Sequence, residues 1–116
     1  MATYWAAELC LLMAVSSSGR GNRVMTSTDG ISWTNRVSAA DNAWTSLCWS
    51  SERELLVAVA SSGTGNRIMT SPDGITWTVR SSPADSGWRS ICWSPQRSQF
   101  VAVSNSGSAN RVIVSP

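Results

Sequence analysis

Short apolar runs alternate with clusters of serine, glycine and aspartate along the whole chain. Residues 44–50 (Trp-Thr-Ser-Leu-Cys-Trp-Ser) and 55–60 (Leu-Leu-Val-Ala-Val-Ala) are two such runs, and a polar turn separates them. Runs rich in β-branched and aromatic residues between turn-forming clusters are typical of β-strands, and no stretch shows the period of an amphipathic helix. The chain is therefore predicted to be all-β.

This pattern recurs every 44 residues. The phrase Ser27-Thr28-Asp29-Gly30-Ile31-Ser32-Trp33 returns as Ser71-Pro72-Asp73-Gly74-Ile75-Thr76-Trp77. Residues 24–67 align with 68–111 without a gap, and 25 of the 44 aligned positions are identical. A period in this range is typical of four-stranded propeller blades.

The repeated phrase predicts a tight hairpin turn. An Asp side chain accepts hydrogen bonds from nearby backbone N–H groups, and a Gly that follows it tolerates a positive φ angle. The Trp three residues later returns on the next strand, where it can fold over the turn and bury it.

The pattern Ser-x-Asp-Gly-x-x-Trp resembles the Asp-box of the BNR-repeat β-propellers, a group that includes sialidases, sortilin-like receptors and several lectins. The resemblance implies that the box lies between the third and fourth strands of a blade, on its outer rim, and that it is structural and not catalytic. The structural positions implied in this way are Ser27, Asp29, Gly30, Trp33, Ser71, Asp73, Gly74 and Trp77.

We expect the chain to form propeller blades of four antiparallel strands. In the best-defined repeat the strands run from the innermost to the outermost over residues 44–50, 55–60, 67–71 and 76–81. The blades are then expected over residues 2–37, 44–81 and 88–116. The third lacks its outer strand, because the sequence stops one residue before the next Asp-Gly pair is due. A segment of a partner chain could pair with the edge that this leaves.

An arc of three blades would expose two large apolar faces, because the inner strands of a blade are apolar on both sides. We therefore expect the chain to bind itself and to complete its ring by homo-oligomerisation. A homodimer with six blades is favoured, since that number is common among Asp-box propellers, and a trimer with nine is second. Small lectins made of two propeller repeats, which assemble into a closed ring, are a precedent.

The composition narrows the other partners and the cofactors. The net charge is +2, and all nine positive side chains are Arg spread at repeat spacing, so nucleic acid is not expected as a partner. No apolar stretch approaches the roughly 18 residues that span a bilayer, so no membrane is expected. The start lacks the basic segment of a signal peptide, and a cytoplasmic location is favoured.

The three cysteines predict neither a disulfide framework nor a metal site. Cys48 and Cys92 are repeat equivalents, Cys10 is not, and the chain contains no His. We interpret Cys48 and Cys92 as small core residues. No metal and no cofactor is expected.

An enzyme is not expected either. In the family that this repeat resembles, sialidase catalysis needs an Arg triad, a Tyr nucleophile paired with a Glu, and an acidic Asp. The only Tyr is Tyr4, near the N-terminus, and without His a Ser or Cys nucleophile lacks its usual base. No catalytic residue is therefore assigned.

A repeated carbohydrate site is the favoured function. Carboxylate and amide groups bind sugar hydroxyls, and a Trp face stacks on the C–H side of a sugar ring. Two alternatives stay open: an architectural, recently duplicated or engineered fragment without a ligand, and a platform for protein partners. The Asp residues could also only cap their own turns. The candidate ligand-binding residues are Asp41, Trp44, Asp85, Trp88, Asn66 and Asn110.

Overall fold

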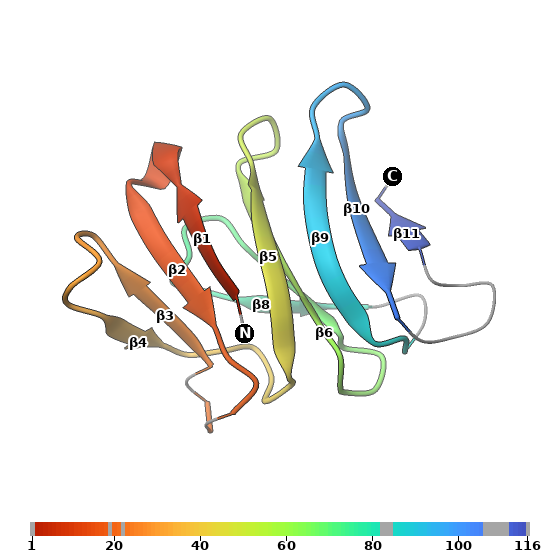
Figure 1. The fold of residues 1–116 in the computed structure, drawn as a ribbon, viewed down its shortest axis with the longest axis horizontal. Helices are drawn as coiled ribbons and strands as arrows, with labels where there is room; N and C mark the ends of the chain where they lie inside the picture. The colour runs from red at the N-terminus through yellow and green to blue at the C-terminus, as the bar shows by residue number, and fades with distance from the viewer. Residues whose placement is uncertain (1, 19, 22, 82–84, 106–111, 116) are drawn as a thin grey trace.

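A computed structural model describes residues 2–18, 20–21, 23–81, 85–105 and 112–115. These residues form three antiparallel sheets of four, four and three strands, consistent with propeller-blade-like units (Figure 1). The N-terminal sheet contains β1 (Ala2–Ala6), β2 (Leu11–Val15), β3 (Val24–Ser27) and β4 (Thr34–Arg36). The central sheet contains β5 (Trp44–Ser50), β6 (Leu55–Ala60), β7 (Ile68–Ser71) and β8 (Thr78–Arg80). The C-terminal sheet contains β9 (Trp88–Ser94), β10 (Gln99–Ser104) and β11 (Val112–Val114).

Strand order within each sheet follows the chain, so consecutive strands are antiparallel neighbours. The all-β prediction and the strand counts are confirmed, and two predicted strands, 44–50 and 55–60, coincide with β5 and β6. The outer strand β8 is shorter than the predicted 76–81, because the Ser-x-Asp-Gly turn continues to its start.

The turn between the first and second strands of each sheet ends in the same backbone conformation. Cys10, Glu54 and Ser98 are repeat equivalents, and their φ angles are 51°, 50° and 51°. The first of these turns contains a short 3-10 helix, η1 (Ala7–Leu9), which the sequence pattern did not predict. A segment of three residues is too short to show a helical period in sequence.

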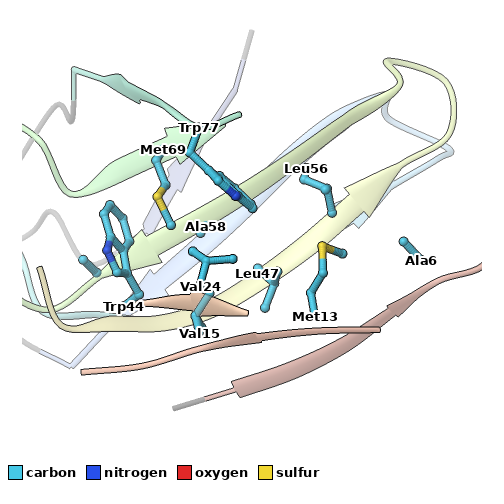
Figure 2. Close-up of a cluster of buried hydrophobic side chains, with 11 residues drawn as sticks. Ala6, Met13, Val15, Val24, Trp44, Leu47, Leu56, Ala58, Met69 and Trp77 are labelled. Carbon is cyan, nitrogen blue, oxygen red and sulfur yellow. The ribbon is translucent and has the colours of Figure 1, made fainter. Parts of the chain in front are cut away.

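The sheets stack side by side, and the central sheet is buried on both faces. One cluster fills the space between the N-terminal and central sheets; it includes Met13, Val15, Val24, Leu56, Met69 and Trp77 (Figure 2). A second cluster joins the central and C-terminal sheets; it includes Cys48, Val57, Val59, Ile91, Phe100 and Ala102. Successive side chains on β6 enter opposite clusters, as the two-residue period of a strand requires. Each cluster therefore combines one face of one sheet with the opposite face of the next.

Candidate functional site

The two Ser-x-Asp-Gly turns have the same hydrogen bonds. In the second, the backbone N–H groups of Ile75 and Thr76 donate to Asp73 Oδ1 at 2.9 and 3.0 Å, and Gly74 N donates to Ser71 Oγ at 2.8 Å. Gly74 has a φ angle of 82°, which favours glycine. The first turn repeats these contacts around Asp29, with distances of 2.8 and 2.9 Å from Ile31 N and Ser32 N.

These contacts keep both turn carboxylates ionised. The N–H groups of Thr76 and then Ile75 lower the pKa of Asp73 below its ordinary value, and those of Ser32 and Ile31 do the same for Asp29. An ionised carboxylate that accepts backbone hydrogen bonds organises its own loop. Such geometry fits the structural role expected for these residues.

The two Trp residues that follow the turns differ in exposure. Trp77 is 8% exposed, donates from Nε1 to Gly74 O at 3.1 Å, and lies in the cluster against the N-terminal sheet. Its equivalent Trp33 is 38% exposed. No described sheet covers the corresponding face of the N-terminal sheet, so the same motif leaves an aromatic ring in solvent there.

The candidate residues Asp41 and Asp85 lie in equivalent loops, each before the first strand of a sheet. Asp41 accepts from Gly21 N at 2.7 Å, and Asp85 accepts from Gly65 N at 2.8 Å. Each carboxylate also lies near an Arg Nε, 3.8 Å from that of Arg23 and 3.7 Å from that of Arg67. The carboxylates of Asp41 and Asp85 are 43% and 39% exposed, so each joins two loops and still reaches solvent.

The Arg and Asn side chains of these loops bind backbone carbonyl groups. Arg67 donates to the carbonyl oxygens of Gly63, Ser61 and Ser86, at 2.8, 2.9 and 3.0 Å. Asn42 Nδ2 donates to the backbone oxygen of Asn66 at 2.8 Å. These side chains hold the loops in place. The candidate residue Asn110 lies outside the described residues.

The two Trp residues proposed to stack on a sugar are buried, which corrects the predicted role. Trp44 and Trp88 are both 0% exposed and lie in the first and second apolar clusters. Trp44 Nε1 donates to Ala40 O at 3.0 Å. Trp44 and Trp88 are the first residues of β5 and β9, the innermost strands of their sheets. Their rings lie in the packed space between sheets, so neither ring has a free face for a ligand.

Of the cysteines, Cys48 is buried and Cys10 and Cys92 are exposed. Burial raises the pKa of Cys48 to about 12, with a further contribution from Cys92, so its thiol stays neutral. Cys92 is exposed, and the interpretation of this residue as a core residue is therefore wrong for the single chain. The described part of the chain holds no group of His, Cys, Asp and Glu that could bind a metal ion. No helix within it is both long and apolar enough to cross a bilayer.

An apolar cavity lies where the central and C-terminal sheets meet. Its volume is about 420 Å³. Its walls come from β6, β7 and β8 of the central sheet and from β9, β10 and β11 of the C-terminal sheet.

Comparison of the chain with known protein families, with curated proteins and with solved structures gives no match. The residues themselves therefore supply the arguments for function. Three kinds of surface among the described residues could bind a partner: the polar loops around Asp41 and Asp85, the outer faces of the two terminal sheets, and an apolar cavity.

Proposed function

We propose that the chain is a non-enzymatic propeller-like segment that binds copies of itself through its two outer sheet faces and closes a ring. One observation carries the proposal: these faces bear the repeat equivalents of residues that pack against each other inside the chain. The hydrogen bonds of the Ser-x-Asp-Gly turns support the resemblance to the Asp-box.

Met13, Val15 and Val24 lie on the inner face of the N-terminal sheet, which packs against the central sheet. The outer face of the same sheet is also apolar. Trp5, Met25 and Trp33 are exposed by 50%, 38% and 38%. Their equivalents in the central sheet are Trp49, Met69 and Trp77, which all pack into the first cluster. In the central sheet this face is covered, and Met69 has no exposed surface.

The outer face of the C-terminal sheet also exposes apolar side chains. Val103, Val112 and Val114 are exposed by 44%, 60% and 57%. Their equivalents in the central sheet are Val59, Ile68 and Thr70, of which Val59 is 0% and Thr70 is 7% exposed. Large exposed apolar surfaces of this kind mark sites of association.

The internal packing indicates how two copies meet. Inside the chain, Met13, Val15 and Val24 pack against Leu56, Met69 and Trp77. The equivalents of the first set are Val101, Val103 and Val112 on the C-terminal sheet, and those of the second are Leu12, Met25 and Trp33 on the N-terminal sheet. The C-terminal face of one copy therefore matches the N-terminal face of the next. Such a heterologous contact closes a ring if its rotation allows, and we favour two chains over three.

Measuring the molar mass in solution by light scattering tests the assembly. We expect a multiple of the 12.4 kDa chain mass for the unmodified protein. Met25→Arg and Val103→Arg should each give the mass of one chain, because a charge would be buried without a partner. Ile31→Arg is the control, since Ile31 is 84% exposed and its equivalent Ile75 stays 46% exposed in the covered central sheet. A single-chain mass for the unmodified protein at high concentration contradicts the proposal.

Mixing the two charged variants tests the direction of the contact. Met25→Arg keeps an intact C-terminal face and Val103→Arg an intact N-terminal face. An equimolar mixture should therefore restore a two-chain species, although neither variant forms one alone. If Val103→Arg alone still associated, the contact would join two N-terminal faces, and the head-to-tail arrangement would be wrong.

Carbohydrate binding is a second candidate, and the repeated carboxylates of Asp41 and Asp85 support it. Both remain partly exposed beside an Arg at the same end of the sheets. A glycan array with the assembled protein tests this function. Binding should be saturable and should be lost in Asp85→Asn, whereas Glu54→Gln, at the opposite end of its sheet, should leave it unchanged. An array without any binding would contradict the carbohydrate function and would leave the proposed self-assembly unaffected.

A further inference from the structure

The cavity between the central and C-terminal sheets has a counterpart that is filled. In the equivalent space between the N-terminal and central sheets lies the Trp77 side chain (Figure 2). A Cβ atom placed on Gly74 would lie 3.0 Å from Leu11 Cδ2 and 3.1 Å from Met13 Sδ. The turn thus packs directly on the sheet next to its own.

The residues that this turn and Trp77 cover have equivalents in the cavity wall. Leu11, Met13 and Val24 correspond to Leu55, Val57 and Ile68, which all line the cavity. Val24 is 1% exposed beneath its cover, whereas Ile68 is partly exposed. The cavity therefore lies between the central and C-terminal sheets at the place where the hairpin with Trp77 lies between the N-terminal and central sheets.

The strand beside the cavity has a free edge. In the central sheet β7 pairs with β8 through Ile68↔Arg80, Met69↔Val79 and Thr70↔Thr78. The equivalent strand, β11, pairs with β10 and has no second neighbour within the described residues. Its outer backbone groups can accept an added strand, and side-chain pockets give such strand addition its specificity.

Arg53 and Arg80 belong to the cavity lining, and no Asp or Glu does. In the filled counterpart, the carboxylate of Asp73 accepts hydrogen bonds from its own loop, from Ile75 N and Thr76 N. The apolar walls and the strand edge therefore supply the main contacts for a peptide.

From these contacts we propose that the cavity and the edge of β11 form a docking site for an extended peptide of another chain. The peptide carries the pattern Ser-x-Asp-Gly-x-x-Trp, pairs antiparallel with β11, and inserts its Trp between the two sheets. The volume of about 420 Å³ lies within the range of pockets that hold small ligands. Apart from Val114, which also belongs to the outer face, the β9, β10 and β11 residues of the lining are on the inner face of the C-terminal sheet, so the site does not rest on ring closure.

Titration calorimetry with a synthetic peptide of residues 71–81 tests the site. We expect saturable binding of one peptide per chain. A peptide with Ala at the position of Trp77 should bind at least about tenfold more weakly, because it leaves the cavity unfilled. Saturation absent at about 1 mM peptide, or equal binding of the two peptides, would overturn the proposal. Free indole binding as tightly as the peptide would also overturn it, since strand pairing would then contribute nothing.

Variants of the protein locate the bound peptide. Ile113 packs against the second cluster and lines the cavity, so Ile113→Glu should abolish binding. Ile113→Ala, which keeps the strand apolar, should weaken binding several-fold and serves if Ile113→Glu does not fold. Val103→Arg, on the opposite face, should bind the peptide normally. Because this variant is also expected to stay monomeric, normal binding to it separates the docking site from the assembly, and loss of binding there would contradict the site.

Discussion

The two interfaces between the three sheets are built from equivalent residues, yet one is closed and the other is open. Between the N-terminal and central sheets, Trp77 fills the outer part of the space, and Met69 is fully buried. Between the central and C-terminal sheets the corresponding space is a cavity, and Ile113, the equivalent of Met69, is only partly buried. The outer hairpin of a sheet, and not its inner strands, therefore seals that sheet against the sheet before it.

The interfaces also differ in one polar contact near the first turns. Trp49 Nε1 donates to Glu8 Oε1 at 3.0 Å across the first interface. At the second, Glu52, the equivalent of Glu8, accepts instead from Ser98 Oγ at 3.1 Å. The buried Nε1 of Trp93 has no hydrogen-bond partner among the described residues. The open interface thus also contains an unsatisfied donor.

The largest effect is expected from removing the side chain that seals the closed interface. Trp77→Ala should lower the free energy of unfolding by about 3–5 kcal/mol, the usual cost of deleting a buried aromatic ring. The equivalent Trp33→Ala should cost about 1 kcal/mol, since its ring is already partly in solvent. Urea unfolding of both, in the Val103→Arg background to exclude assembly, measures the difference. Equal losses would mean that the two positions are equally covered.

A smaller effect should distinguish the two equivalent indoles. Trp49→Phe loses the hydrogen bond to Glu8 as well as ring volume, whereas Trp93→Phe removes a donor that has no partner. We expect Trp49→Phe to be the more destabilising by about 1 kcal/mol, because a made hydrogen bond is lost in one case and an unsatisfied buried donor is removed in the other. The same unfolding titrations provide the values. A reversed order would indicate that Trp93 Nε1 is satisfied in solution.

The turn carboxylates should make both sheets sensitive to acid. The folded pKa values of Asp29 and Asp73 lie below the ordinary 3.8, so the folded chain binds these protons less readily than the unfolded chain does. Their contribution to stability is therefore complete above about pH 5 and is lost as the pH falls through 3.8 toward the folded values. Asp29→Asn with Asp73→Asn should flatten this acid limb in thermal unfolding curves. An unchanged slope would assign the acid sensitivity to other groups.

The smallest effect concerns a feature common to all three sheets. Glu54 adopts a φ angle of 50°, a region that glycine enters without strain. Glu54→Gly should stabilise the chain by up to about 1 kcal/mol, whereas Leu55→Gly, one residue later in β6, should destabilise it by at least that amount. The melting temperatures of the two variants give the comparison. Destabilisation by Glu54→Gly would show that the side chain contributes more than the backbone strain costs.

The strands could be predicted because their signals are local and repeated. The runs at 44–50 and 55–60 combine apolar residues with flanking turns, and each is supported by its copies one period away. The turn contacts of Asp29 and Asp73 could be predicted for the same reason. Asp followed by Gly specifies its own hydrogen bonds over four residues.

Burial could not be predicted from the repeat, because it depends on which sheets lie on either side. Trp33 and Trp77 share one motif, and Cys48 and Cys92 share one position, yet only the member in the central sheet is buried in each pair. Trp44 and Trp88 follow polar loops, and this local pattern predicts a solvent-facing site. Their place at the start of an innermost strand, next to two packed faces, was the signal that could have corrected this.

The central sheet shows one set of side chains to the neighbour before it and another set to the neighbour after it, and both outer sheets repeat that polarity. Nothing in these contacts distinguishes a neighbour on the same polypeptide from one on a different polypeptide. The positions of the chain ends are therefore exchangeable by whole units of 44 residues. A version of the chain that is permuted or lengthened by one such unit would present the same surfaces at its two ends. Gene duplication can therefore change the length of this protein without altering any interface between sheets.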